Sequence, residues 1–369
     1  MTSPKRLAFF LPDMRGGGAE RVALRLIEDF LKAGQEVDLV LLEEKGELLS
    51  LLPAEVQVFD LKAPRVRNGL LPLIRYFRRR RPHAMQISMW PLTVLGIVAH
   101  RLARSQARLV TSDHAALSKH VPPSRPRAYR LLAWSTRLFY PLADARILVA
   151  NDAADDLARL SGLDRASLEV VYNPVGRPPA ALPPAPHIEA LWGEAERRIL
   201  TVGALKAQKN HALLVRSFAR VFKGAPAKLM ILGQGELRNP LESLVAELGV
   251  ADQVLLPGFA TDPWPYYASA HLFALSSDYE GYPLVLIEAL RSGLPIVSTD
   301  CESGPREILA GGRYGTLVPV GDEAALATAL EHAFGRELDR EALRARAEAI
   351  SGQTTSDRYL ELMLGPPSP

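Results

Sequence analysis

The feature that most restricts the fold of this chain is a cluster of prolines between Asn173 and Trp192. Six prolines fall within this stretch: Pro174, Pro178, Pro179, Pro183, Pro184 and Pro186. Proline fixes φ and offers no backbone N–H, so this density continues neither a helix nor a central strand. We therefore predict a linker over residues 176–192. With 369 residues, the chain is too long for one ordinary core and suits two α/β domains.

The part before the prolines reads as alternating strands and helices. A strand is predicted over Lys5–Leu11, a glycine-rich loop over Asp13–Gly18, an amphipathic helix over Ala19–Ala33 and a strand over Gln35–Leu42. The apolar run Ala84–Ala99 includes Gln86 and Pro91 and is shorter than the roughly 20 residues that span a bilayer. It predicts a buried strand followed by a helix. The alternation favours a mainly parallel sheet with helices on both faces.

A second series of the same kind follows the prolines. The predicted strands are 198–202, 228–232, 253–256, 271–275 and 295–299, and the predicted helices are 211–222, 240–248, 283–292 and a region within 341–364. We therefore predict domains at 1–175 and 193–345, with a helical segment at 346–369 that can pack on either. In open parallel sheets, ligands bind at the C-terminal ends of the strands, so these ends are expected to line a cleft between two doubly wound domains.

The segment Ser276–Glu288 has the most informative chemistry. Its polar loop follows a strand, and Pro283 stands where a helix takes its first residue, so the free N–H groups there favour a phosphate or a sugar oxygen. Gly281 lets a ligand approach the backbone. Glu280 and Glu288 can reach different hydroxyls of one elongated ligand. The plain alternative is a capped helix with two solvated glutamates.

With this Glu280–Glu288 spacing, the chain resembles the retaining glycosyltransferases of family 4, which carry an E-x7-E motif. Further segments resemble the family's loops in the same order: Gly16–Val22, Val202–Asn210, Ile231–Gly235, Leu256–Phe259 and Cys301–Glu307. The resemblance implies a GT-B fold, in which two Rossmann-like domains face each other across a cleft. The acceptor would bind to the N-terminal domain and the nucleotide sugar to the C-terminal one.

The resemblance also implies roles for individual residues. Glu280, Lys209 and His114 would be catalytic, with Glu280 on the donor sugar, Lys209 on the diphosphate and His114 near the transferred sugar. The donor and nucleotide would meet Gly16, Gly17, Gly203, Lys209, Gly233, Phe259, Glu280, Gly281, Tyr282, Pro283, Leu284 and Glu288. The family's usual arginine is replaced by Ala204, and Lys206 or Arg15 are the candidates to supply the missing charge.

Basic residues are concentrated in residues 62–146, where 17 lysines and arginines face only two acids, Asp113 and Asp144. This block indicates an anionic partner, or else a solvated basic surface. We predict an acceptor and membrane face made of Arg75, Arg78, Arg79, Arg80, Arg130, Trp134 and Arg137. The two segments that carry these residues are alternatively ordinary amphipathic helices whose apolar faces join the core. Nucleic acid is not expected, since no RNA-binding or zinc-finger pattern is present.

Taken together, the sequence predicts a retaining glycosyltransferase that moves a sugar from a nucleotide sugar, expected to be a UDP-sugar, to a saccharide acceptor such as a lipid-linked glycan. A nucleotide-sugar epimerase and a silent sugar-nucleotide-binding protein remain alternatives. No metal or cofactor is expected, because no metal-ligand spacing appears. The sequence also matches neither the GxGxxG motif of dehydrogenases nor the P-loop motif. The single cysteine and the missing signal peptide predict a cytoplasmic protein, with peripheral association to the inner face of the membrane.

Overall fold

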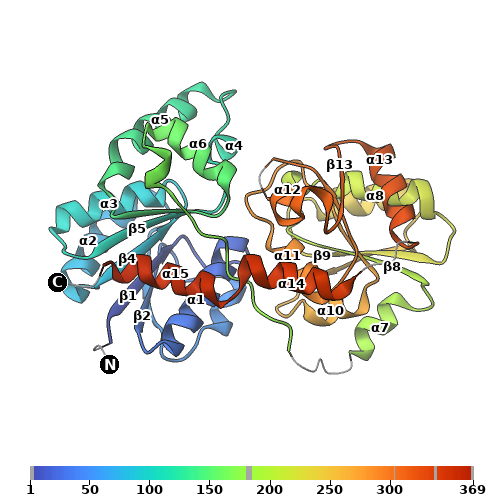
Figure 1. Cartoon of the computed structure of the whole chain (residues 1–369), viewed down its shortest axis with the longest axis horizontal. Coiled ribbons are helices and arrows are strands. Elements are labelled where there is room, and N and C mark those ends of the chain that lie inside the picture. Colours follow the sequence, from blue (N-terminus) through green and yellow to red (C-terminus); the bar gives the residue numbers. More distant parts are fainter. Residues whose placement is uncertain (1–3, 180–184, 303, 336–338, 367–369) are drawn as a thin grey trace. The chain divides into compact units, whose positions relative to one another are not determined.

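The computed structural model describes residues 4–179, 185–302, 304–335 and 339–366, which form two compact α/β units (Figure 1). Unit 1 comprises residues 1–174 and 352–369, and unit 2 comprises residues 175–351. Each unit is built on one parallel sheet with covering helices. The predicted α/β class is therefore confirmed.

Unit 1 contains a seven-stranded parallel sheet in the order β3-β2-β1-β4-β5-β6-β7. Its strands are β1 (Arg6–Leu11), β2 (Glu36–Leu41), β3 (Gln57–Asp60), β4 (Ala84–Ser88), β5 (Arg108–Asp113), β6 (Ala145–Leu148) and β7 (Glu169–Val170). Its helices are α1 (Gly18–Lys32), α2 (Leu70–Arg80), α3 (Leu92–Ala103), α4 (Leu117–His120), α5 (Pro126–Phe139), α6 (Asn151–Ser161) and α15 (Gln353–Leu364).

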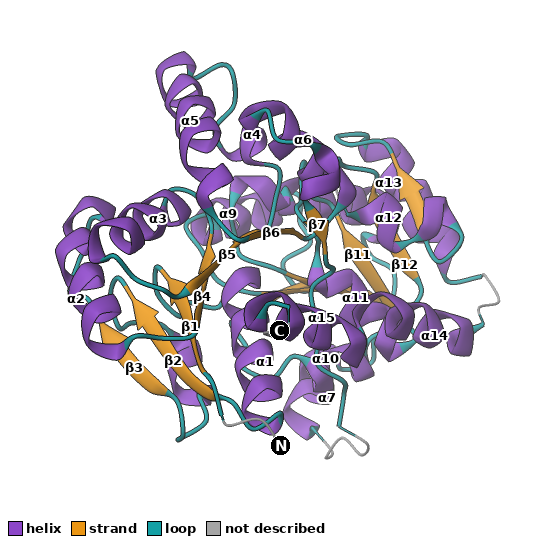
Figure 2. Ribbon diagram, turned by 60° about the vertical axis from the view of Figure 1, so that its left-hand side comes forward, coloured by secondary structure: helices purple, strands orange, loops and turns teal. Residues whose placement is uncertain are grey.

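Neighbouring residues of β1 show how the two faces of this sheet are covered. Side chains alternate between the faces along a strand. Phe9 packs on Phe30 of α1, with the ring centroids 5.6 Å apart. Phe10 lies in the core cluster that α2 and α3 complete. Figure 2 shows α1 and α15 on the opposite face of the sheet from α2 and α3.

The C-terminal helical region divides between the units at Gly352. Helix α14 (Arg340–Ser351) packs on unit 2, where the Arg291 guanidinium donates to the backbone oxygen of Ser351 at 2.9 Å. Helix α15 packs on unit 1, where the Ser356 hydroxyl donates to the Asp29 carboxylate at 2.6 Å. The segment predicted as one piece over 346–369 therefore changes partner within its length.

Unit 2 contains a six-stranded parallel sheet in the order β10-β9-β8-β11-β12-β13. Its strands are β8 (Arg197–Val202), β9 (Ala227–Leu232), β10 (Val254–Gly258), β11 (Leu272–Leu275), β12 (Ile296–Thr299) and β13 (Thr316–Val318). Besides α14, its helices are α7 (Pro186–Trp192), α8 (His211–Phe222), α9 (Arg238–Glu247), α10 (Trp264–Ser269), α11 (Leu284–Ser292), α12 (Pro305–Ile308) and α13 (Glu323–Ala333). Strands β8 and β11 are neighbours although about 70 residues separate them, which brings the loops that follow them together.

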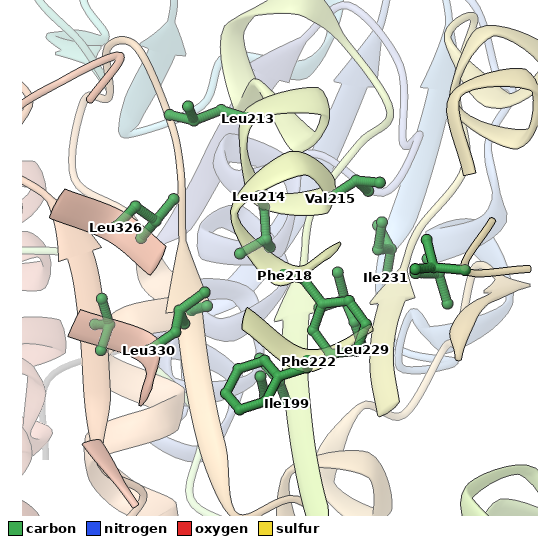
Figure 3. Close-up of a cluster of buried hydrophobic side chains, with 14 of the residues drawn as sticks. Ile199, Leu213, Leu214, Val215, Phe218, Phe222, Leu229, Ile231, Leu326 and Leu330 are labelled. Atoms are coloured by element: carbon green, nitrogen blue, oxygen red, sulfur yellow. The ribbon is translucent and has the colours of Figure 1, made fainter. Parts of the chain in front are cut away.

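A fully buried apolar cluster joins α8 and α13 to one face of this sheet. Figure 3 shows Leu214, Phe218 and Phe222 of α8 beside Leu326 and Leu330 of α13. All five side chains are 0% exposed. Because packed apolar side chains hold both helices on the strands, this cluster fixes where β8 ends and α8 begins.

The linker predicted over residues 176–192 is too long, because its last part forms α7. Pro186 opens this helix, a position where the missing N–H of proline has no cost. Trp192 is 0% exposed, and its Nε1–H donates to the Ser269 hydroxyl at 2.8 Å. Residues 180–184 of the predicted linker lie outside the described residues.

Candidate functional site

Lys209 and Glu280 form an ion pair between two loops at the C-terminal edge of the unit 2 sheet. Lys209 ends the short 3-10 helix Ala207–Lys209 after β8, and Glu280 follows β11. The Lys209 Nζ lies 2.7 Å from the Glu280 Oε1, and the Ser277 hydroxyl donates to the same oxygen at 2.5 Å. Glu280 is 5% exposed. The structure therefore brings two predicted site residues into direct contact.

The same two loops are held together by further hydrogen bonds. The Asp278 backbone N–H donates to the Gln208 carbonyl oxygen at 2.9 Å, and the Gln208 side-chain amide donates to the Tyr279 carbonyl oxygen at 2.9 Å. The Ser276 hydroxyl donates to the Lys209 carbonyl oxygen at 3.0 Å. These bonds fix the backbone on both sides of the ion pair. Ser277 and Gln208 were missed from the sequence, where they read as ordinary polar loop residues.

Two predicted donor-site glycines allow close approach of the loops after β8 and β9. A Cβ on Gly233 would stand 2.0 Å from the Gly203 carbonyl oxygen. A Cβ on Gly203 would touch the aliphatic stem of Lys209 at about 3.4 Å. Only glycine fits at position 233, because the 2.0 Å contact of a Cβ there would be a steric overlap. Phe259, predicted beside them, follows β10 and is partly exposed.

Helix α11 begins one residue later than predicted. Pro283 is the N-cap rather than the first helical residue, and no side chain caps the helix. Tyr282 is 4% exposed. Gly304, at φ +99°, passes so close that a Cβ there would stand 2.5 Å from the Pro283 Cδ. The backbone N–H groups of Leu284 and the next residues are thus at a helix N-terminus, which favours anions.

Glu288 lies in α11 and is 8% exposed. Its Oε2 accepts a hydrogen bond from the Tyr267 hydroxyl at 2.7 Å. Tyr267 is fully buried in α10 and stacks on Phe273, with centroids 5.7 Å apart. Tyr267 therefore fixes the rotamer of Glu288, a residue predicted to bind the nucleotide. The sequence gives no signal for this role, because a tyrosine in an aromatic segment predicts core packing.

Two buried titratable groups lie beside the ion pair. Burial, and then the nearby Glu280 charge, raise the pKa of the Cys301 thiol to about 12. Burial, and then the Lys209 charge, lower the pKa of His211 to about 4. Both groups are therefore neutral at pH 7, and the charges here are those of Lys209 and Glu280.

His114, the third predicted catalytic residue, lies in unit 1 directly after β5. Its Nε2 is 3.3 Å from the Ser112 hydroxyl, and burial lowers its pKa to about 4, against a smaller opposite effect of Asn173. The adjacent Asp113 is 1% exposed, and its Oδ2 accepts from the Tyr140 hydroxyl at 2.9 Å. Burial raises the pKa of Asp113 to about 7. His114 is therefore a neutral imidazole at physiological pH.

The glycine loop of unit 1 presents an exposed helix N-terminus. Helix α1 starts at Gly18, and its N-cap, Gly17, carries no capping side chain. Gly16 and Gly17 are exposed. Arg15, a candidate to replace the arginine missing at Ala204, is paired with Asp13, with its Nη2 2.7 Å from the Asp13 Oδ2. Lys206, the other candidate, is exposed.

The predicted membrane face comprises two amphipathic helices, α2 and α5, which each bury part of their apolar face. In α2, the apolar residues Leu73, Ile74 and Phe77 are buried, which is the ordinary amphipathic alternative. Arg75, Arg78 and Arg79 are exposed, but Arg80 binds the buried Asp38 carboxylate at 3.0 Å. Arg80 is therefore a poor candidate for a lipid or phosphate. In α5, Arg130, Trp134 and Arg137 are all exposed.

The described residues contain neither a helix able to span a bilayer nor a cluster of metal-binding side chains. No helix in residues 4–179, 185–302, 304–335 and 339–366 has the length and apolarity needed to cross a bilayer. Within those same ranges, no cluster of three histidine, cysteine, aspartate or glutamate side chains is placed to hold a metal.

Comparison with known families assigns both units. The family described as "Glycosyltransferase Family 4" matches residues 16–176, and the family described as "Glycosyl transferases group 1" matches residues 187–349. Together these matches cover most of both units. The chain belongs to the group 1, family 4 glycosyltransferases, and the resemblance inferred from its motifs is confirmed.

Individual relatives align over most of the chain. The N-acetylgalactosamine-N,N'-diacetylbacillosaminyl-diphospho-undecaprenol 4-alpha-N-acetylgalactosaminyltransferase of Campylobacter jejuni is 29% identical, covering 98% of this chain and 100% of the relative. The amylovoran biosynthesis glycosyltransferase AmsD of Erwinia amylovora is 28% identical, covering 81% of each.

Solved structures confirm the predicted GT-B fold. The HepE protein of Anabaena, in complex with UDP and glucose, superimposes with a TM-score of 0.79 at 18% identity, covering 97% of this chain and 98% of its own. WaaG, a glycosyltransferase involved in lipopolysaccharide biosynthesis, superimposes with a TM-score of 0.74 at 17% identity, covering 98% of this chain and 100% of its own. At these identities the likeness concerns the fold alone.

Proposed function

We propose that this protein transfers a glycosyl group from a UDP-sugar to a polyprenyl-diphosphate-linked saccharide, with retention at the anomeric carbon and without a metal ion. The observation that carries the proposal is the buried contact between the Lys209 Nζ and the Glu280 Oε1, 2.7 Å apart, in loops tied by backbone hydrogen bonds. The names of the relatives support the acceptor class, since one acts on a diphospho-undecaprenol-linked saccharide. A UDP-bound structural neighbour supports the nucleotide.

The ion pair supplies groups for both ends of the donor. Lys209 and Ser277 both contact Oε1 of Glu280, and no described residue donates to its Oε2. Oε2 is thus the oxygen that accepts from a sugar hydroxyl. A diphosphate carries more charge than one carboxylate, so a bound donor draws the Lys209 ammonium toward its phosphates. The N-terminus of α11 adds backbone N–H groups on the same side.

The reaction breaks the bond between the anomeric carbon and the donor diphosphate, and it forms a bond from that carbon to the acceptor oxygen on the same face. The acceptor proton passes to the departing phosphate oxygen. Lys209 and the α11 N-terminus stabilise the negative charge on the leaving diphosphate, the role that a metal plays elsewhere. In unit 1, the neutral imidazole of His114, whose pKa burial lowers to about 4, is available to hydrogen-bond a sugar hydroxyl.

The acceptor and the membrane belong to the same proposal. The basic block of residues 62–146 matches an acceptor that carries a diphosphate and sits in a lipid surface. We place the protein in the cytoplasm, on the inner face of the membrane, in the assembly of a cell-surface polysaccharide or glycoconjugate.

A donor screen tests the proposal. UDP-sugars are incubated with polyprenyl-diphosphate saccharides, and the products are read by mass spectrometry, with the anomeric configuration assigned by NMR. We expect an acceptor lengthened by one α-linked sugar when the donor is α-linked. A UDP-sugar interconverted without acceptor would favour the epimerase alternative, and tight UDP binding with no turnover on any pair would favour a silent binding protein.

A further inference from the structure

Helix α5 has an outward face that combines apolar and basic side chains. Leu131 is 54% exposed, Trp134 is 58% exposed and Leu138 is 50% exposed. Their spacing of three and four residues places them in one stripe along the helix. Leu142, in the turn that follows, is 40% exposed. Apolar side chains of this size, exposed together, mark a surface that contacts another apolar phase.

Arginines accompany this stripe along its whole length. Arg127, Arg130 and Arg137 are exposed on α5. Among the described residues, none of these three guanidinium groups is paired with a carboxylate. The sequence contains no aspartate or glutamate between Asp113 and Asp144. A leucine and tryptophan stripe flanked by unpaired arginines fits an anionic lipid surface, where the apolar groups enter the acyl boundary and the guanidinium groups meet the phosphates.

The inner face of α5 connects this surface to the neighbourhood of His114. Ser135 is 4% exposed, and its hydroxyl accepts from the Trp90 Nε1–H at 3.0 Å. Tyr140, in the turn Tyr140–Leu142 that follows α5, donates to the Asp113 carboxylate at 2.9 Å. Asp113 precedes His114 directly. A helix fixed in the lipid surface therefore fixes the end of β5 as well.

We propose that α5 is the membrane-inserting element of this protein, and that Leu131, Trp134 and Leu138 enter an anionic bilayer while Arg127, Arg130 and Arg137 bind its headgroups. Helix α2 is not such an element, because Leu71, at 62% exposed, is its one large exposed apolar side chain and forms no stripe, whereas Leu73, Ile74 and Phe77 are buried. Only the purpose of this insertion rests on the proposed function: it would hold the enzyme beside a lipid-linked acceptor. Vesicle binding is measured without any substrate.

The first test is flotation of the full chain with vesicles of phosphatidylglycerol and phosphatidylethanolamine, against phosphatidylcholine alone. Leu131→Gln/Leu138→Gln is expected to weaken binding to anionic vesicles by at least about tenfold, since each side chain loses apolar burial. Arg127→Gln/Arg130→Gln/Arg137→Gln is expected to weaken it at low salt and to flatten its salt dependence. The matched control on α2, Leu71→Gln/Arg75→Gln/Arg79→Gln, is expected to stay within about threefold of wild type.

The second test uses the fluorescence of Trp134. Emission of the wild type shifts to shorter wavelength on addition of anionic vesicles, because the indole enters a less polar phase. In Trp134→Phe this shift disappears while flotation is largely kept. Circular dichroism and the thermal midpoint verify that every variant is folded.

Three outcomes would overturn the assignment of α5. Wild-type protein that fails to float with anionic vesicles would exclude the membrane as the partner. An equal loss of vesicle binding in the α2 control would mean that a diffuse basic surface, rather than α5, binds the membrane. A dimer in solution that Leu131→Gln/Leu138→Gln converts to a monomer would make a second copy the occupant.

Activity on a lipid-free acceptor separates this inference from the proposed function. Leu131→Gln/Leu138→Gln is expected to lose transfer to a vesicle-embedded acceptor but to keep the wild-type rate with a short-chain acceptor in buffer. Transfer in buffer without vesicle binding by the wild type would overturn the α5 assignment alone. Vesicle binding without turnover on any acceptor would overturn the proposed function alone.

Discussion

The Lys209 ammonium and the Glu280 carboxylate are 2.7 Å apart, although they are 71 positions apart in the chain. The neighbouring strands β8 and β11 bring them together, and the side chains are 18% and 5% exposed. A pair this well buried holds two charges in place before any donor binds. It also makes each charge dependent on the other.

A double-mutant cycle should reveal this dependence. Lys209→Met alone leaves a buried carboxylate without its cation, so we expect about 3 kcal/mol less unfolding free energy. Glu280→Gln leaves the ammonium without its anion and costs a similar amount. The double variant, Lys209→Met/Glu280→Gln, should lose less unfolding free energy than the two single variants lose in sum. Denaturant unfolding followed by tryptophan fluorescence measures all four proteins, and additive losses would mean that the contact does not couple the two residues.

Tyr267 should affect donor binding without reacting itself. Tyr267→Phe removes the hydroxyl that donates to the Glu288 Oε2 at 2.7 Å. Glu288 then loses its fixed orientation, so we expect the KM for the donor to rise about tenfold while kcat stays within about twofold. Steady-state kinetics with varied UDP-sugar give both constants. Tyr266→Phe, one residue earlier in the same helix, serves as control, and an equal effect there would assign the change to α10 as a whole.

Asp113 and His114 should give opposite pH dependences of stability. The folded-state pKa of Asp113 is raised from 3.8 to about 7, so its contribution to stability is present at low pH and is lost as pH rises between these values. The pKa of His114 is lowered from 6.5 to about 4, so its contribution is present above 6.5 and is lost as pH falls toward 4. Between about pH 4.5 and 6.5 the two effects offset each other in the wild type.

Single variants should therefore separate these effects. Relative to wild type, Asp113→Asn should lose stability on acidification from about pH 6.5 to 4.5, and His114→Gln should lose it on the opposite change, each by up to about 1.4 kcal/mol per pH unit. Unfolding free energies at several pH values measure the slopes. Parallel slopes in the wild type and both variants would show that neither group titrates as its burial implies.

Metal removal should not affect turnover. The proposed mechanism gives the leaving diphosphate the Lys209 ammonium and the N-terminus of α11, so no cation is needed. We expect kcat in excess EDTA to stay within about twofold of the value with Mg²⁺. A loss that Mg²⁺ or Mn²⁺ restores would contradict this part of the mechanism.

Local patterns predicted most elements, because apolar periodicity and turn residues decide them. The bounds predicted for α8, His211–Phe222, agree with the structure. Helix α7 was missed because Pro186 reads as a linker residue, whereas the burial of Trp192 that stabilises the helix depends on Ser269 in a distant segment. The prolines mark the boundary between the units but do not show how soon the next helix begins.

Contacts between distant segments account for what the sequence left open in the site. Lys209, Glu280 and Glu288 were identified by motif, but Ser277 and Tyr267 act through hydrogen bonds that only the folded sheet brings about. The segments of α2 and α5 read alike, as leucines among arginines. Only tertiary packing shows that α2 exposes one such leucine, Leu71, whereas α5 exposes Leu131 and Leu138 in one stripe.

The most direct test of the central claim compares wild type with Glu280→Gln in transfer from a UDP-sugar to a polyprenyl-diphosphate saccharide. The amide keeps the size of the side chain but removes the charge that pairs with Lys209 and accepts from the donor sugar. We predict that kcat/KM falls about 100-fold, while UDP binding, measured by calorimetry, changes by less than about threefold. Glu280→Gln turning over at the wild-type rate would contradict the assignment of this site.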